Sequence, residues 1–190
     1  MRYKKGFTLL ELLIALAILS LLLTISVPSL RQTLERQRGN AILQRLASSI
    51  QFARSSAIKS GQWVTLCPSR EGLQCDAPGD WQDGYIAFFD PERNRVPEND
   101  AALLLRVSMD PAGGSLTWRA FQSKPYLQFT PLGLIAGQSG NFTWCAADND
   151  PALAGQLIIN KVGRVRQAID SDGDGIREDS QGKPLQCRLN

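Results

Sequence analysis

An apolar run near the start of the chain constrains the fold more than any other feature. It extends from Phe7 to Val27, about 21 residues. A helix of that length can cross a hydrocarbon core of about 30 Å. Three basic residues within the first five would hold the preceding end on the cytoplasmic side. We therefore predict a transmembrane helix over residues 7–28. A secretory signal fits less well, because its apolar core would be shorter, about 7–15 residues.

One charged residue, Glu11, interrupts this run. An isolated charge within a membrane costs several kcal/mol. Either Glu11 is tolerated near the membrane edge, or it pairs with another charge inside an assembly. If the chain were cut before Phe7, the new α-amino group of Phe7 would lie about one helical turn from Glu11 and could be such a partner.

The nine residues Lys5-Gly6-Phe7-Thr8-Leu9-Leu10-Glu11-Leu12-Leu13 closely resemble the class III signal of type IV pilins and type II secretion pseudopilins. The resemblance implies that residues 1–6 are a leader, which a prepilin peptidase removes by cutting after Gly6. The same enzyme would then N-methylate Phe7. Glu11 matches the family glutamate, which is expected to neutralise the N-terminal amine of a neighbouring subunit during assembly. Pro28 matches a helix-kinking proline of these subunits.

Apolar residues at helical spacing continue beyond the apolar run. They predict an amphipathic half of the helix over residues 29–60, with Gly61 as its C-terminal cap. The apolar positions of this half are Leu30, Leu34, Ala41, Leu46, Ile50, Ala53 and Ala57. The basic residues of this stretch either form a solvated face or contact anionic lipids or acidic neighbours.

Short runs rich in β-branched and aromatic residues follow Gly61, separated by Gly, Pro, Asn and Asp. They predict a β-rich globular domain over residues 61–190, with residues 76–83 and 90–100 as exposed loops. The fold class is therefore α+β, a long N-terminal helix packed on an antiparallel β-sheet. The predicted strands are Trp63–Cys67, Tyr85–Phe89, Leu103–Val107, Leu116–Arg119, Leu127–Thr130, Asn141–Cys145 and Leu157–Asn160.

The order of helix and strands, together with the helix end Gln51-Phe52-Ala53-Arg54-Ser55-Ser56-Ala57, resembles the GspH/FimT branch of minor pilins and pseudopilins. Ser56 stands where an acidic residue is frequent in that branch. The resemblance implies a type IV pilin-like fold and assembly with other major and minor pilins.

The four cysteines predict disulfides, because an even number in a chain with an export signal indicates an oxidising compartment. Three pairings exist, and we favour Cys67–Cys75, which closes a short loop, and Cys145–Cys187, which ties the C-terminal tail to the body. Buried or free thiols are the alternative. No CxxC pair is present, which disfavours a zinc site.

A basic turn is predicted near the C-terminal end. Gln156–Lys161 and Arg164–Ile169 read as two extended segments joined at Val162-Gly163, where Gly163 can adopt a positive φ. Arg164 and Arg166 would share one strand face, with Lys161 beside them. The sequence Gly163-Arg164-Val165-Arg166 resembles the GRxR motif of FimT-type minor pilins, which contributes in some of them to binding DNA during natural transformation. Salt bridges or a contact with the next subunit are the alternatives.

An acidic segment follows the basic turn. Asp170, Asp172 and Asp174 alternate before Gly175, as in the first half of a calcium-binding loop, and Glu178 or Asp179 could add an oxygen. Gln181 stands where an EF-hand would carry its final glutamate. The two interpretations are a Ca²⁺ site and a solvated acidic turn.

These features favour a filament subunit over an enzyme. The chain has no histidine, no GxSxG motif and no Walker loop. The formal net charge is +3, and the three basic residues of the leader account for all of it, so binding of a polyanion would depend on a local patch. We predict an inner-membrane, single-pass minor pilin of a type IV pilus with its globular domain in the periplasm. It would bind double-stranded DNA weakly and without sequence preference. The alternative is a GspH-like pseudopilin of type II secretion.

Overall fold

The computed structural model describes residues 6, 8–76, 80–109, 113–120, 123–137 and 139–187, without the side chains of residues 23 and 25–29. The chain divides into two compact units, residues 1–37 and residues 38–190. Most of the predicted leader, residues 1–5, lies outside the described residues, as does Phe7.

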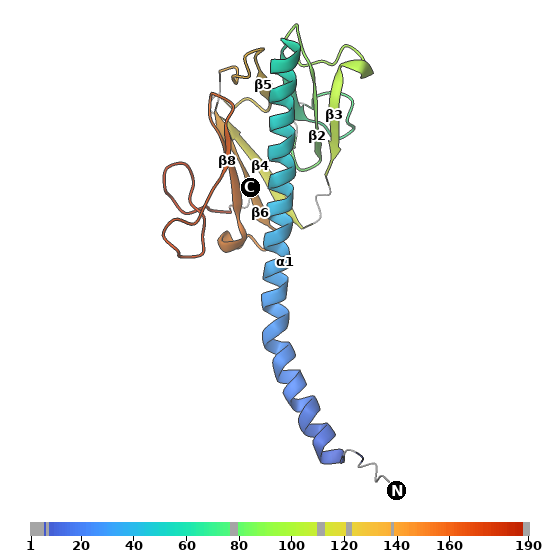
Figure 1. The fold of residues 1–190 in the computed structure, drawn as a ribbon, viewed down its shortest axis with the longest axis vertical. Helices are drawn as coiled ribbons and strands as arrows, with labels where there is room; N and C mark the ends of the chain where they lie inside the picture. Colours follow the sequence, from blue (N-terminus) through green and yellow to red (C-terminus); the bar gives the residue numbers. More distant parts are fainter. Residues whose placement is uncertain are drawn as a thin grey trace. The chain divides into compact units, whose positions relative to one another are not determined.

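The N-terminal helix α1 extends from Leu9 to Ser60 (Figure 1). It ends where the sequence predicted, because Gly61 follows with a φ of 66° and so terminates the helix in the left-handed region. No helix among the described residues is both long and apolar enough to cross a membrane. The predicted span over residues 7–28 includes Phe7 and the side chains of residues 23 and 25–28, which lie outside the description.

The globular unit buries one face of the second half of α1. Leu43, Leu46, Ile50, Ala53 and Ala57 are each at most 1% exposed, at the three- and four-residue spacing of one helix face. The predicted apolar positions of the earlier turns are exposed. Leu30 and Leu34 are 60% and 58% exposed, and Ala41 is also exposed. The first buried apolar side chain among those described in the helix is that of Leu43, which was not among the predicted positions.

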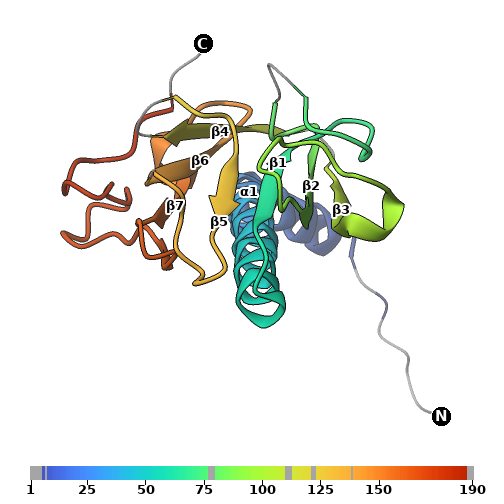
Figure 2. The ribbon, with the colours of Figure 1, turned by 90° about the horizontal axis from the view of Figure 1, so that it is seen from above.

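Two antiparallel four-stranded sheets complete the globular unit, in the orders β3-β2-β1-β5 and β4-β6-β7-β8. Figure 2 shows them side by side over the part of α1 that belongs to this unit. This arrangement confirms the predicted α+β class. The strands are β1 Val64–Pro68, β2 Gly84–Phe89, β3 Leu103–Ser108, β4 Gly114–Ala120, β5 Leu127–Phe129, β6 Gly140–Ala146, β7 Gly155–Ile159 and β8 Val165–Gln167. Two short 3-10 helices, η1 Asp100–Ala102 and η2 Pro151–Leu153, lie between strands.

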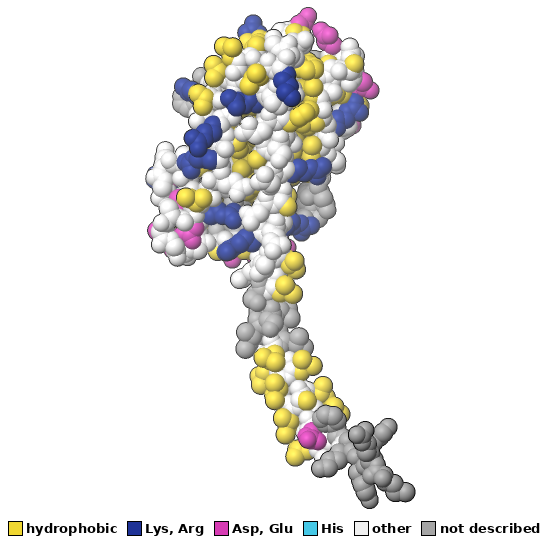
Figure 3. All heavy atoms as spheres, viewed as in Figure 1, with side chains coloured by type: hydrophobic (Ala, Val, Ile, Leu, Met, Phe, Trp, Pro, Cys, Tyr) yellow, Lys and Arg dark blue, Asp and Glu magenta, His cyan; other side chains and the backbone are white. Residues whose placement is uncertain are grey.

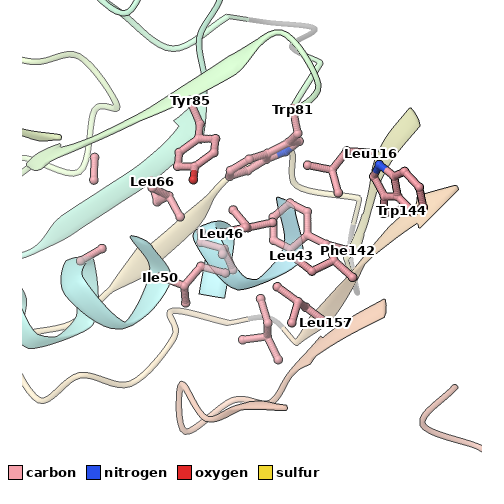
Figure 4. Packing of buried hydrophobic residues seen from close by; sticks show 14 of the residues in the cluster. Leu43, Leu46, Ile50, Leu66, Trp81, Tyr85, Leu116, Phe142, Trp144 and Leu157 are labelled. Carbon is pink, nitrogen blue, oxygen red and sulfur yellow. The ribbon is translucent and has the colours of Figure 1, made fainter. Parts of the chain in front are cut away.

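One core joins the helix to both sheets (Figure 4). Leu66 and Tyr85 come from the first sheet, and Phe142 and Leu157 come from the second. Trp81 stacks edge-on against Phe142 with ring centroids 4.7 Å apart, a favoured aromatic geometry. The apolar faces of the helix and of the two sheets are therefore buried against one another, which fixes both sheets on the helix.

Gly39 allows the ring of Trp144 to pack closely against α1. A Cβ atom at this position would lie 2.4 Å from a ring carbon of Trp144 in β6. Trp144 is itself buried, at 2% exposure. The glycine therefore makes room for the indole, although glycine lowers helix stability by about 1 kcal/mol relative to alanine.

The structure contains both predicted disulfides, Cys67–Cys75 and Cys145–Cys187. The second joins β6 to the C-terminal tail. Leu185 reinforces this attachment, because its amide donates to the carbonyl of Arg177 at 2.8 Å and its side chain is buried beside Cys145. The tail therefore belongs to the folded unit.

A buried carboxylate organises the segment after β2. Asp90, predicted within an exposed loop, is 1% exposed. Its Oδ2 accepts hydrogen bonds from Thr65 at 2.6 Å and from Gln128 at 3.0 Å, and its Oδ1 accepts from the amide of Asn94 at 3.0 Å. Asp90 therefore ties β1, β5 and the following turn together.

Tyr85 gives the globular unit a pH dependence at the alkaline side. Burial raises the pKa of Tyr85, and a hydrogen bond between its hydroxyl and Ser49 partly opposes the shift. The contribution of Tyr85 to stability is therefore complete below its unfolded pKa of about 10 and is lost as pH rises through the higher folded value.

We expect the melting temperature of the full chain in detergent to fall as pH rises above about 10, and to fall less steeply for Tyr85→Phe. The variant starts from a lower value at pH 8, because it loses the hydrogen bond to Ser49, worth about 1 kcal/mol. Melting curves measured at half-unit pH steps test this. If the melting temperature fell equally with pH in both proteins, Tyr85 would not be the cause of the pH dependence.

Candidate functional site

Gly6 precedes α1, and Glu11 lies in its first turn. Gly6 is exposed. Thr8 and Glu11 form a reciprocal pair, in which the amide and hydroxyl of Thr8 donate to Glu11 Oε2 and the amide of Glu11 donates to Thr8 Oγ1. This is a capping box, whose signal T-x-x-E was present in the sequence but not used. Glu11 therefore has a helix-starting contact in addition to its predicted role in assembly.

The predicted basic turn is a hairpin between β7 and β8. The register places Ile158 opposite Arg166 and Ile159 opposite Val165. Gly163 has a φ of 74°, and its amide donates to the carbonyl of Asn160 at 2.9 Å. A glycine in this conformation closes a three-residue hairpin loop.

The turn is packed against two segments that are distant in the sequence. A Cβ atom on Gly163 would lie 2.8 Å from Arg54 Nε and 2.8 Å from the carbonyl oxygen of Gly133. Arg54 Nε donates to that same carbonyl at 2.9 Å, and the amide of Ile135 donates to the carbonyl of Lys161 at 3.0 Å. Arg54 was not predicted as part of the site, and it holds the Gly133 carbonyl against which the turn packs. Gly163 is thus required for close packing as well as for its conformation.

The three cationic side chains of the turn are exposed. Lys161, Arg164 and Arg166 form no ion pair with any residue in the described part of the chain. Arg166 faces away from the core, because Val165 beside it packs against the core cluster. Figure 3 shows Lys and Arg side chains over the β8 side of the globular unit, with Asp and Glu side chains lower on the same side. The turn therefore presents guanidinium groups to solvent.

The acidic loop after β8 brings four carboxylates together. One oxygen from each of Asp170, Asp172, Asp174 and Glu178 lies within 4.8 Å of the others. Of the two additional ligands that the sequence suggested, only Glu178 joins this cluster. Asp179 instead accepts from the amides of Gln181 and Lys183.

Two solved structures identify the fold as that of a type IV pilin-like subunit. The type IV minor pilin FimU of Pseudomonas aeruginosa matches at 18% identity and a TM-score of 0.56, over 81% of this chain and 98% of that one. A second crystal form of FimU matches with a TM-score of 0.51 at the same identity, over 78% and 99%. The minor pseudopilin EpsH of the Vibrio cholerae type 2 secretion system aligns over 68% of this chain and 94% of that one, at 11% identity and a TM-score of 0.49. No curated protein has a significantly similar sequence.

Two family models match this chain, over residues 1–27 and over residues 43–163. Residues 1–27 match the prokaryotic N-terminal methylation motif. Residues 43–163 match the family described as type II transport protein GspH. The chain belongs to this GspH family, whose members are minor pilins and pseudopilins, as the sequence resemblance predicted. The methylation motif implies processing by prepilin peptidase and anchoring in a membrane. Arg164 and Arg166 lie just beyond the matched range.

Proposed function

We propose that this chain is a minor pilin of a type IV pilus that binds double-stranded DNA through Lys161, Arg164 and Arg166. In this proposal residues 7–28 anchor the subunit in the inner membrane by a single pass, with the globular unit in the periplasm before assembly into the pilus. The observation that carries the proposal is the group of three exposed cations, without ion pairs among the described residues, on the turn between β7 and β8.

The chemistry of the turn suits phosphate. A guanidinium group offers planar donors that can bind two phosphate oxygens at once. Arg54, Gly133 and Gly163 fix the position of the turn, so little ordering of the backbone is needed on binding. Phosphate contacts carry no sequence information, so the binding is expected to be independent of sequence.

The expected affinity per subunit is low. Three cations neutralise at most about three phosphates. For a duplex, the logarithm of the binding constant should then fall with the logarithm of the salt concentration with a slope of about −2.7, the salt slope. Several subunits along one filament, or further pilins, would therefore be needed to hold DNA firmly.

The test is DNA binding by the full chain in detergent, measured by fluorescence anisotropy with a labelled duplex at 50 and 200 mM salt. We expect the double variant Arg164→Gln/Arg166→Gln to weaken binding at least about tenfold at low salt. The salt slope should fall by about 1.8, because two phosphate contacts are lost.

Arg119→Gln is the matched control for the single variant Arg166→Gln. Arg119 is an exposed arginine on β4, the opposite edge strand of the same sheet. Its loss should change binding less than twofold. Equal losses for the two single variants would indicate a diffuse electrostatic effect, and absence of binding by the unaltered chain would overturn the proposal.

The second candidate function is that of a type II secretion pseudopilin, which the GspH family match over residues 43–163 supports. In that case the basic turn would contact another subunit of the filament. Loss of filament assembly in the double variant, with DNA binding absent throughout, favours this function.

A further inference from the structure

The loop between β8 and the C-terminal tail carries a second candidate site. We propose that Asp170, Asp172, Asp174 and Glu178 bind one calcium ion. One carboxylate oxygen of each already lies within 4.8 Å of the others. None of the four forms an ion pair with a cation in the described part of the chain. Four negative charges at such spacing repel one another strongly unless a cation lies between them.

The strongest indication of a ligand comes from Glu178. This residue is only 7% exposed, and acidic side chains are almost never buried unless they are paired. Its Oε2 accepts from the amide and hydroxyl of Ser171 at 2.8 and 2.6 Å. Its Oε1 is buried and accepts no hydrogen bond from any residue that the structure describes. A buried carboxylate oxygen without a donor is unfavourable, and a cation in the cluster would satisfy it.

The loop holds its carboxylates in place before any ion binds. Both oxygens of Asp170 accept backbone amides, from Gly173 at 2.7 Å and from Gly175 at 2.9 Å. The amide of Glu178 donates to the carbonyl of Ile169 at 3.0 Å, which closes the base of the loop. Arg177, the preceding residue, reaches Asn40 on α1 at 3.0 Å. The loop is therefore connected to the helix as well as to β8.

The ligand set favours calcium over other common divalent ions. All four side chains offer hard oxygen atoms, and the cluster contains no nitrogen or sulfur ligand of the kind that zinc prefers. Calcium accepts 6–8 oxygens in variable geometry, so backbone carbonyls and water can complete its shell. Magnesium requires near-octahedral geometry and usually binds only one or two carboxylates.

Calcium would also change the surroundings of the basic turn. Asp170 follows Arg166 by four residues, so the acidic loop opposes the approach of phosphate to the turn. A bound Ca²⁺ adds two positive charges, which offset two of the negative charges in this region. The calcium proposal nevertheless does not depend on DNA binding, and it is tested without DNA.

The test is calorimetric titration of the metal-free full chain in detergent with calcium chloride. We expect one ion per chain, with a dissociation constant between about 1 µM and 1 mM, and at least tenfold weaker binding of magnesium chloride. At a calcium concentration of about 100 times the dissociation constant, the melting temperature should rise by about 5–10 °C. No binding heat together with no rise in melting temperature would overturn the proposal.

Asp172→Asn is the informative variant, and Asp148→Asn is its control. Each of these exposed aspartates accepts one backbone amide at 3.1 Å, from Asp174 and from Asp150 respectively, and asparagine can keep that contact. We expect Asp172→Asn to weaken calcium binding at least tenfold and Asp148→Asn to leave it unchanged.

Glu178→Gln should weaken calcium binding by at least as much as Asp172→Asn, since it removes the charge of the buried ligand. If the glutamine variant fails to fold, Asp172→Asn still decides the question. Calcium affinity unchanged in Asp172→Asn would place the ion elsewhere and overturn the assignment of this loop.

Discussion

Replacement of Asp90 by alanine is expected to lower the free energy of unfolding by about 3–5 kcal/mol. The alanine removes both oxygens that accept from Thr65, Gln128 and Asn94. Thr65 is fully buried and Gln128 is 7% exposed, so water cannot easily replace the lost acceptor. Denaturant unfolding of the full chain in detergent, followed by tryptophan fluorescence, measures the change.

Asp90→Asn is the control for this prediction. Asparagine keeps the shape and one acceptor oxygen, so its Oδ1 can still bind the amide of Asn94. We expect a loss of about 1–2 kcal/mol, clearly smaller than that of alanine. A loss below about 1 kcal/mol for Asp90→Ala would show that the buried network does not stabilise the fold.

Gly39→Ala is expected to destabilise the chain by about 2–3 kcal/mol, although the same change in an exposed helix position stabilises by up to about 1 kcal/mol. The added methyl group would lie 2.4 Å from the ring of Trp144, and this buried indole has little space to move. Thermal melting of the variant measures the direction as well as the size of the effect.

Two comparisons isolate the contact between Gly39 and Trp144. Ser48→Ala, at an exposed position on the same helix, should raise the melting temperature slightly. In a Trp144→Phe background, the smaller ring leaves space, so Gly39→Ala should cost at least about 1 kcal/mol less than in the original chain. If Gly39→Ala costs the same free energy of unfolding in both backgrounds, its clash is not with Trp144.

Local patterns in the sequence predicted most of the fold. The end of α1 at Ser60 follows from helical periodicity followed by glycine, and each predicted strand coincides with an observed strand to within a residue or two. Both disulfide pairings were also predicted. These features depend on residues that are close in sequence or on few alternatives. The exposed positions Leu30 and Leu34 show the limit of periodicity, which indicates an apolar face but not what covers it.

Contacts between distant segments were not predictable from such patterns. Gly163 was expected to need a positive φ, but its packing against Arg54 and Gly133 depends on how β7 and β8 lie on the helix. Asp90 was expected in a loop because Asp is common in loops, and its partner Gln128 is 38 residues away. Likewise Glu178 was one of two candidate ligands, and the folded loop places Glu178 in the cluster while Asp179 accepts the amides of Gln181 and Lys183.

The Cys145–Cys187 disulfide has a consequence for proteolysis. It closes a covalent ring over a sequence separation of 42 residues, which contains β7, β8 and the exposed acidic loop. A protease that cuts this loop once would open the ring without releasing a fragment. The cleaved chain would keep its mass on a non-reducing gel and would separate into two pieces only after reduction. In an oxidising compartment, a subunit nicked in this loop would therefore retain its tail.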